Sequence, residues 1–106
     1  MKIYNKMIRD NIPEIIAASN KKANVRTLSN DEFFYELKKK LIEESTELLE
    51  TSSKEDVIEE LADIYELIEF IKKEAGIDEA AVLKFKEEKN KKRGSFIKKL
   101  FLESVE

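Results

Sequence analysis

Four acidic residues, arranged as two pairs with the same spacing, are the side chains of this sequence best suited to chemistry. Glu44 and Glu47 lie in the string E-E-S-T-E at residues 43–47, and Glu60 and Asp63 lie in E-L-A-D at residues 60–63. Residues three apart share one face of a helix, so each pair can face a common point. Four carboxylates at close quarters repel one another, and a divalent cation between them removes most of that repulsion. The pattern therefore favours a metal site.

The composition limits what such a site can use. The chain has 106 residues with no His and no Cys, which excludes imidazole ligands, thiolate ligands and disulfides. Oxygen ligands favour Mg²⁺, with Mn²⁺ as an alternative. Such a metal can bridge the phosphates of a substrate and activate a water molecule, a reactivity that these side chains otherwise lack.

Helices must position these acids. Gly occurs twice and Pro once, which is typical of long helices, and the short chain leads us to expect one all-α domain over residues 1–106. Capping residues and breakers predict a short helix over 13–18 and a long helix from 29 or 30 to about 50. They also predict a second long helix from about 54 to 75 and a third from about 79 to 93. The connection at 51–53 is so short that the two long helices should form an antiparallel hairpin.

The apolar residues of the hairpin indicate where the acids fall. On the first long helix, Glu44 fills a gap in the seam, and a carboxylate there needs a cation or hydrogen-bond donors. The residues of this seam are Phe34, Leu37, Leu41 and Leu48. On the second, Glu60 and Asp63 lie on the side that Leu67 and Phe70 widen. The residues of the second seam are Val57, Leu61, Ile64, Ile68 and Ile71. The second apolar face is too wide for one partner helix, which indicates a subunit interface.

Charge is segregated along the chain. Residues 30–79 carry 17 acids against 6 bases, although the net charge is only −3, so the flanks are basic. Lys6 and Arg9 near the N-terminus, and Lys89 and Arg93 one turn apart on the third helix, are candidates for binding substrate phosphates. The alternative is that they are solvated charges with local acidic partners. The acidic centre argues against binding of nucleic acid.

The two ends of the chain carry further signals. Charges interrupt every apolar run near the N-terminus, so we expect no signal peptide, no membrane span and a cytoplasmic location. Tyr4 and Phe96 either stack on a base or belong to the core. The tail at 95–106 is rich in apolar residues, so we expect it to pack against the protein.

The two acidic strings, separated by twelve residues, resemble the E-E-x-x-E and E-x-x-D signature of MazG-type all-α nucleotide pyrophosphohydrolases. The strings Y-N-K-M-I-R-D-N-I-P at 4–13 and K-R-G-S-F at 92–96 resemble the phosphoribosyl-ATP pyrophosphohydrolase-like branch. This resemblance covers nearly the whole chain. It implies Mg²⁺ bound by Glu44, Glu47, Glu60 and Asp63, and cleavage between the α and β phosphates of a nucleotide, releasing pyrophosphate. It also implies a homodimer or homotetramer in which helices of two protomers build a four-helix-type bundle.

Two functions follow from these patterns. The first is an enzyme that clears non-standard or surplus nucleotides, which we favour over one acting on a histidine-pathway-like phosphoribosyl nucleotide. The second is a non-catalytic helical module that binds a nucleotide or a partner helix and uses the same acids structurally. Glu43 precedes the first expected ligand and, by its helical position, points away from the seam as a solvated residue.

Overall fold

The computed structural model describes residues 1–106 as four α-helices without a β-strand. The prediction of an all-α chain is therefore confirmed. The chain divides into two compact units, Met1–Gly76 and Ile77–Glu106. The sequence-based expectation of one domain over residues 1–106 stays a prediction. None of the helices combines the length and the apolarity that crossing a bilayer requires.

The first unit begins with an irregular segment and the short helix α1 (Ile12–Ala18). Pro13 lies in its first turn, where the missing N–H group has no intrahelical partner to lose. The turn before α1 is closed by a hydrogen bond of 3.1 Å from the Ile12 N–H group to the Arg9 carbonyl oxygen. This turn fixes where the Arg9 side chain leaves the backbone.

Helix α2 (Asn30–Leu49) begins with a complete capping box. Ser29 Oγ accepts from the Glu32 N–H group at 3.2 Å, and the Glu32 carboxylate accepts from the Ser29 N–H group at 3.0 Å. Arg26 donates to both Glu32 oxygens at 3.2 and 2.8 Å. The Arg26 hydrogen bond is the largest of the causes that lower the pKa of Glu32 to about 2.

Helix α3 (Lys54–Ala75) follows after the four residues 50–53. Ser53 Oγ accepts from the Asp56 N–H group at 3.1 Å, as the spacing of these two residues predicts. The helix ends at Gly76, whose φ of 65° lies in the left-handed region that Gly adopts most easily. The predicted boundaries of both long helices are confirmed to within one residue.

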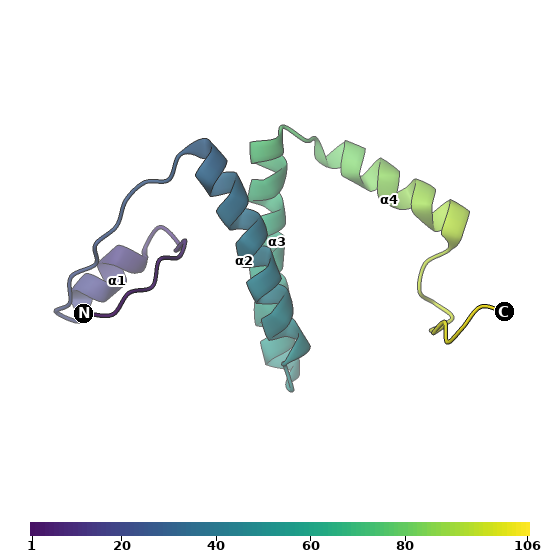
Figure 1. Ribbon diagram of the computed structural model, residues 1–106, viewed down its shortest axis with the longest axis horizontal. Coiled ribbons are helices and arrows are strands. Elements are labelled where there is room, and N and C mark those ends of the chain that lie inside the picture. The colour runs from purple at the N-terminus through teal and green to yellow at the C-terminus, as the bar shows by residue number, and fades with distance from the viewer. The chain divides into compact units, whose positions relative to one another are not determined.

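Helices α2 and α3 lie side by side and antiparallel (Figure 1), so the hairpin prediction is also confirmed. Between them lie two buried apolar side chains, Leu37 and Leu67, which are 2% and 8% exposed. Glu44 is the third buried residue, with an exposed fraction of 5%. A carboxylate thus occupies the core of the hairpin itself.

The face that α3 turns toward α2 differs from the predicted seam. Val57, Ile64 and Ile71 are half-buried beside the buried Leu67, whereas Leu61 and Ile68 are 39% and 40% exposed. The apolar face of α3 is wide enough to contact two helices. Helix α2 covers only the side of this face that also carries Glu60 and Asp63. Periodicity alone cannot assign each half of such a face to its partner.

The half of this face that α2 leaves uncovered forms a stripe that we call the outer stripe of α3. Its members recur at steps of three, four and three residues, and therefore share one side of the helix. They are the exposed side chains Ile58, Leu61, Tyr65 and Ile68. Helix α2 carries a comparable exposed series at steps of seven, formed by Tyr35, Ile42 and Leu49.

The second unit contains helix α4 (Glu79–Arg93), which begins where Asp78 Oδ1 accepts from the Ala80 N–H group at 3.3 Å. No residue of α4 is buried. The tail 95–106 has no helix, and its apolar side chains are exposed in the single chain. No residue of this unit is buried, so nothing within it receives the tail, and the expectation that the tail packs stays a prediction.

Candidate metal centre

Glu44 occupies the gap in the apolar seam of α2 that the sequence indicates. Its neighbours on the seam, Leu37, Leu41 and Leu48, are buried or half-buried. The carboxylate is consequently removed from water, and an isolated charge there would be strongly destabilising. What surrounds Glu44 therefore decides what this position can do.

Two acids of α3 reach Glu44 across the hairpin. Carboxylate oxygens of Glu44, Glu60 and Asp63 all lie within 4.8 Å of one another, and we call these three residues the acid cluster. Both α3 residues are half-buried. Glu60 meets Glu44 because the two residues are equally far from Ser52 in the turn, as the sequence predicts, and Asp63 lies one helical turn after Glu60. One oxygen each of Glu44 and Glu60, Oε2 in both cases, is buried and has no hydrogen-bond donor.

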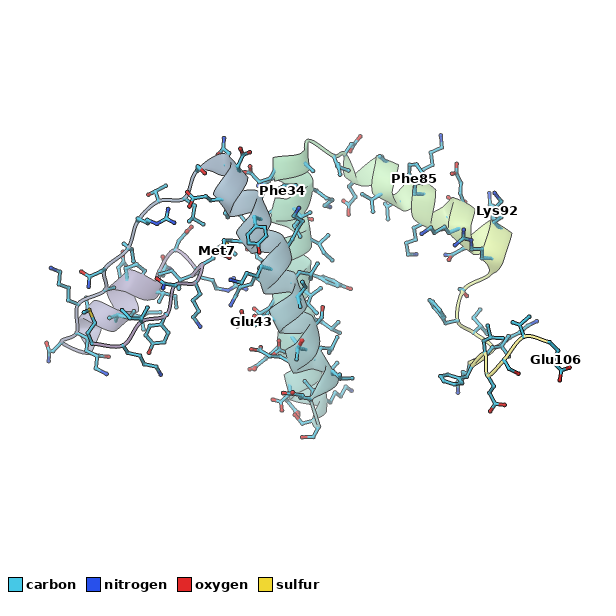
Figure 2. All side chains as sticks on the ribbon, in the orientation of Figure 1. Met7, Phe34, Glu43, Phe85, Lys92 and Glu106 are labelled. Carbon is cyan, nitrogen blue, oxygen red and sulfur yellow. The ribbon has the colours of Figure 1, made fainter.

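Glu47 and Glu43 form a second group around Glu44. One carboxylate oxygen from each of these three residues lies within 4.8 Å of the others. Glu47 is exposed and stands at the open edge of the acid cluster. Glu43, labelled on α2 in Figure 2, is also exposed, as its helical position predicts. The Glu43 carboxylate nevertheless lies near those of Glu44 and Glu47, so Glu43 belongs to the surroundings of the site although it is exposed.

Lys40 is a residue of the site that the sequence did not single out. It lies one turn before Glu44, and its ammonium group is 3.5 Å from an oxygen of Glu44 and 3.5 Å from an oxygen of Glu43. The Lys40 side chain is only 24% exposed. A lysine four residues before a core carboxylate was the available signal, since residues i and i+4 are neighbours on a helix.

The proximity of these acids changes where they titrate. A hydrogen bond shared with Glu44, with burial and the charges of Glu47 and Glu44 adding to it, raises the pKa of Glu60 to about 7. Loss of hydration, with hydrogen bonding and repulsion from Glu44, raises the pKa of Glu47. Burial acts to raise the pKa of Glu44, but hydrogen bonds to Glu60 and Glu47 and the charge of Lys40 outweigh it, so this pKa is lowered. Without a cation, Glu60 is therefore harder to ionise than an ordinary carboxyl group.

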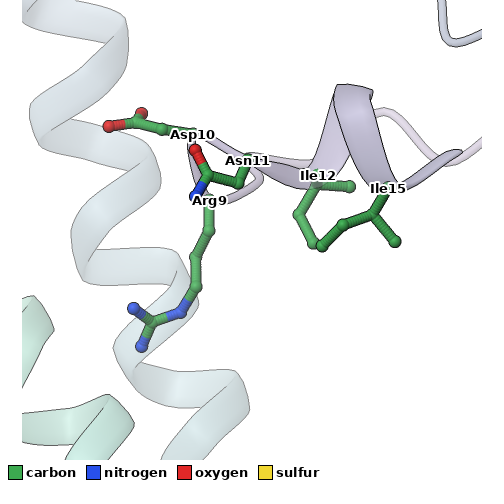
Figure 3. A pocket seen from close by; sticks show the side chains of 5 residues that line it. All are labelled: Arg9, Asp10, Asn11, Ile12 and Ile15. Atoms are coloured by element: carbon green, nitrogen blue, oxygen red, sulfur yellow. The ribbon is translucent and has the colours of Figure 1, made fainter. Parts of the chain in front are cut away.

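Arg9 approaches the acid cluster from the N-terminal segment. Its guanidinium group donates to Asp63 Oδ1 at 2.7 Å, and this ion pair joins residues 54 positions apart in the sequence. Arg9 also lines an open pocket of about 320 Å³ at the start of α1. Figure 3 shows its side chain extending away from α1, with Ile12 and Ile15 on the other side of the pocket.

The other predicted phosphate ligands are Lys6, which lies over the Tyr4 ring, and Lys89 and Arg93 in the second unit. The Lys6 ammonium group lies 5.8 Å from the centre of the Tyr4 ring, and that ring is 63% exposed. Lys89 and Arg93 are exposed one turn apart on α4, as the sequence predicts. Neither Tyr4 nor Phe96 belongs to a core, since their side chains are 63% and 95% exposed.

The acid cluster has the donor set that a hard divalent cation requires. It offers only carboxylate oxygens, which suit Mg²⁺ and Mn²⁺, and no nitrogen or sulfur ligand competes. Two of these oxygens are buried without a donor, so a cation would satisfy groups that the protein leaves unsatisfied. The residues present therefore fit Mg²⁺, with Glu44, Glu60 and Asp63 at the centre and Glu47 at the edge.

Comparison with known proteins adds one relative without an assigned activity. An uncharacterized protein of Mycolicibacterium smegmatis is 42% identical to this chain over 53 residues, which cover 50% of this chain and 54% of that protein. The chain thus spans about half the length of the curated relative that it matches. No family model and no solved structure matches the chain.

Proposed function

We propose that this chain is a Mg²⁺-dependent nucleotide pyrophosphohydrolase of the MazG type, with Mn²⁺ as the alternative metal. The observation that carries the proposal is the buried Glu44, whose Oε2 has no donor and whose carboxylate lies within 4.8 Å of Glu60 and Asp63. A carboxylate placed so deep in the core of a hairpin calls for a cation. The signature that the acidic strings resemble supports the same assignment.

The reaction is the addition of water across the anhydride bond between the α and β phosphates. It yields a nucleoside monophosphate and pyrophosphate from a nucleoside triphosphate or a related nucleotide. Mg²⁺ held by Glu44, Glu47, Glu60 and Asp63 would supply charge stabilisation for the phosphates and a more acidic water molecule. A house-cleaning role in the nucleotide pool, in the cytoplasm, is the form of this activity that we favour.

The chain's own residues have separable tasks in this reaction. Glu44 and Asp63 would hold the cation from opposite helices of the hairpin, because their carboxylates lie on α2 and α3 within 4.8 Å of one another. Glu47 is exposed at the edge of the acid cluster and would complete the ligand set from the solvent side. Lys6, Arg9, Lys89 and Arg93 remain our candidates for binding phosphate groups.

A homodimer or homotetramer built as a four-helix-type bundle is part of the proposal. A hairpin with only two buried apolar side chains has a small core for its size. The outer stripe of α3 offers a second apolar face, and a second copy of the hairpin could cover it by the same helix packing that joins α2 to α3. We therefore propose that two hairpins, one from each of two chains, form the four-helix unit of the dimer or tetramer.

The direct test is pyrophosphate release from a panel of nucleoside triphosphates in the presence of Mg²⁺. We expect Glu44→Gln and Asp63→Asn to reduce the rate at least about a hundredfold, in the range seen when a group stabilising transition-state charge is removed. Glu59→Gln is the matched control, because Glu59 is exposed and directly precedes Glu60. Wild-type rates in Glu44→Gln and Asp63→Asn would exclude the assignment.

A second function is favoured by a specific observation: two basic side chains of the protein form ion pairs with residues of the acid cluster. Lys40 lies 3.5 Å from Glu44, and Arg9 lies 2.7 Å from Asp63. A cluster compensated in this way fits a non-catalytic helical module that binds a nucleotide or a partner helix. That function predicts that EDTA leaves ligand binding unchanged and that Mg²⁺ does not raise Tm.

A further inference from the structure

Arg9 and a bound cation would require the same carboxylate. Asp63 belongs to the acid cluster, with an oxygen within 4.8 Å of Glu44 and Glu60. Its Oδ1 already accepts a hydrogen bond of 2.7 Å from the Arg9 guanidinium group. A guanidinium held so close to Asp63 repels a divalent cation and takes up one of the lone pairs that such a cation would use.

The ion pair is strong enough to hold the N-terminal segment and weak enough to be displaced. Its length of 2.7 Å is that of a charge-assisted hydrogen bond. The two side chains are 61% and 40% exposed, however, and solvent screens an exposed ion pair strongly. A divalent cation on three carboxylates can therefore outcompete Arg9 for Asp63.

Displacement of Arg9 has a consequence for the segment that carries it. Residues 1–11 contain no helix, and Arg9 joins them to α3 across 54 positions of sequence. Two of their neighbouring side chains, Met7 and Ile8, are only half-buried. Loss of the ion pair would leave the segment with little to hold it on the hairpin.

We propose that Arg9 is a latch, which holds the N-terminal segment on Asp63 in the metal-free protein and releases it when a divalent cation takes this carboxylate. The inference rests on the proposed metal site and adds a conformational response to it. By linkage, whatever favours the latched segment weakens metal binding, and metal binding in turn favours release.

Titration calorimetry of the full chain with Mg²⁺ tests the latch without using enzymatic activity. We expect Arg9→Gln to bind Mg²⁺ roughly two- to fivefold more tightly than the wild type, because an exposed ion pair makes a contribution of that size. Lys2→Gln is the matched control, since it removes the same charge from the same segment at a side chain that lies over the Tyr4 ring. It should leave the affinity unchanged.

Hydrogen exchange of the wild type provides a second readout that does not depend on a variant. We expect Mg²⁺ to speed the exchange of amides in residues 1–18 and to leave those of 79–93 unchanged. Equal or weaker Mg²⁺ binding by Arg9→Gln, or unchanged or slower exchange in residues 1–18, overturns the latch and leaves the metal site standing. If neither protein binds Mg²⁺ at millimolar concentration, the latch and the proposed function both fail.

Discussion

The ammonium group of Lys40 lies 3.5 Å from the carboxylate of Glu44, one helical turn away on α2, and both side chains are largely buried. Lys40 therefore acts as an internal counter-ion for the acid in the core of the hairpin. A buried carboxylate that loses its cation keeps its desolvation penalty without compensation. The metal-free protein should depend on Lys40 more than the metal-bound protein does.

This relationship predicts how Lys40→Met behaves. We expect the free energy of unfolding without metal to fall by about 1–3 kcal/mol, the usual effect of leaving a buried charged group unsatisfied. Millimolar Mg²⁺ should raise the free energy of unfolding more in the variant than in the wild type. Urea unfolding with Mg²⁺ or with EDTA measures both quantities. Lys39→Met, at the exposed neighbouring position, should show neither effect. Equal stability of Lys40→Met and the wild type would contradict the counter-ion role.

The pKa of Glu60 predicts a pH dependence with a definite sign. Its pKa of about 7 in the folded protein lies above the ordinary value of 4.5, so between these values the folded form binds more protons than the unfolded form. The stability of the metal-free protein should therefore be highest below about pH 4.5 as far as Glu60 is concerned, and should fall as the pH rises to about 7. The raised pKa of Glu47 acts in the same sense.

Mg²⁺ binding should show the opposite trend, because the cation requires ionised carboxylates. We expect its affinity to increase as the pH rises and to level off above about 7. Glu60→Gln has no proton to lose and should flatten both curves. The lowered pKa of Glu44 affects stability only where the pH falls below 4.5, the ordinary pKa of a glutamate. Glu44 therefore does not contribute to the pH dependence above that value. Calorimetric titrations and urea unfolding from pH 5 to 8 would test both trends.

Local signals in the sequence predict much of this fold and the centre of the site. Ser29, Ser53 and Gly76 mark helix ends by capping and backbone preference, which act within a few residues. The burial of Glu44 follows from the seam, and its meeting with Glu60 follows from the length of the turn. These features need only helical periodicity and one short connection.

The remainder depends on contacts that periodicity does not encode. The pairing of Arg9 with Asp63 joins positions 54 apart, and no local pattern specifies which acid an irregular segment will reach. The wide apolar face of α3 was likewise visible in the sequence, but its division between α2 and solvent was not. Leu61 and Ile68 fit a seam as well as Val57 and Ile64 do, and only the geometry of the hairpin separates them.

The capping box at the start of α2 makes Ser29 a sensitive position. Ser29→Ala removes the acceptor of the Glu32 N–H group and should lower the free energy of unfolding by about 1 kcal/mol, a typical effect for an N-cap. Asn30→Ala, at the exposed first position of the helix, is the matched control and should have a smaller effect. Urea unfolding at neutral pH measures the difference. An unchanged midpoint in Ser29→Ala would show that α2 begins independently of this cap.

The outer stripe of α3 predicts how the oligomer can be broken. Tyr65→Glu places a charge in the middle of the exposed series formed by Ile58, Leu61 and Ile68, and a charge buried there without a partner opposes association. We expect this variant to shift from dimer or tetramer to monomer in size-exclusion chromatography with light scattering. Val25→Glu introduces the same residue at a site that is 61% exposed outside the hairpin, and it should leave the oligomer intact.

An oligomer that survives Tyr65→Glu would place the interface on another face, and a wild-type monomer would remove the bundle from the proposal. Because neither Tyr65 nor Val25 belongs to the acid cluster, Mg²⁺ binding by both variants separates a lost interface from a lost metal site.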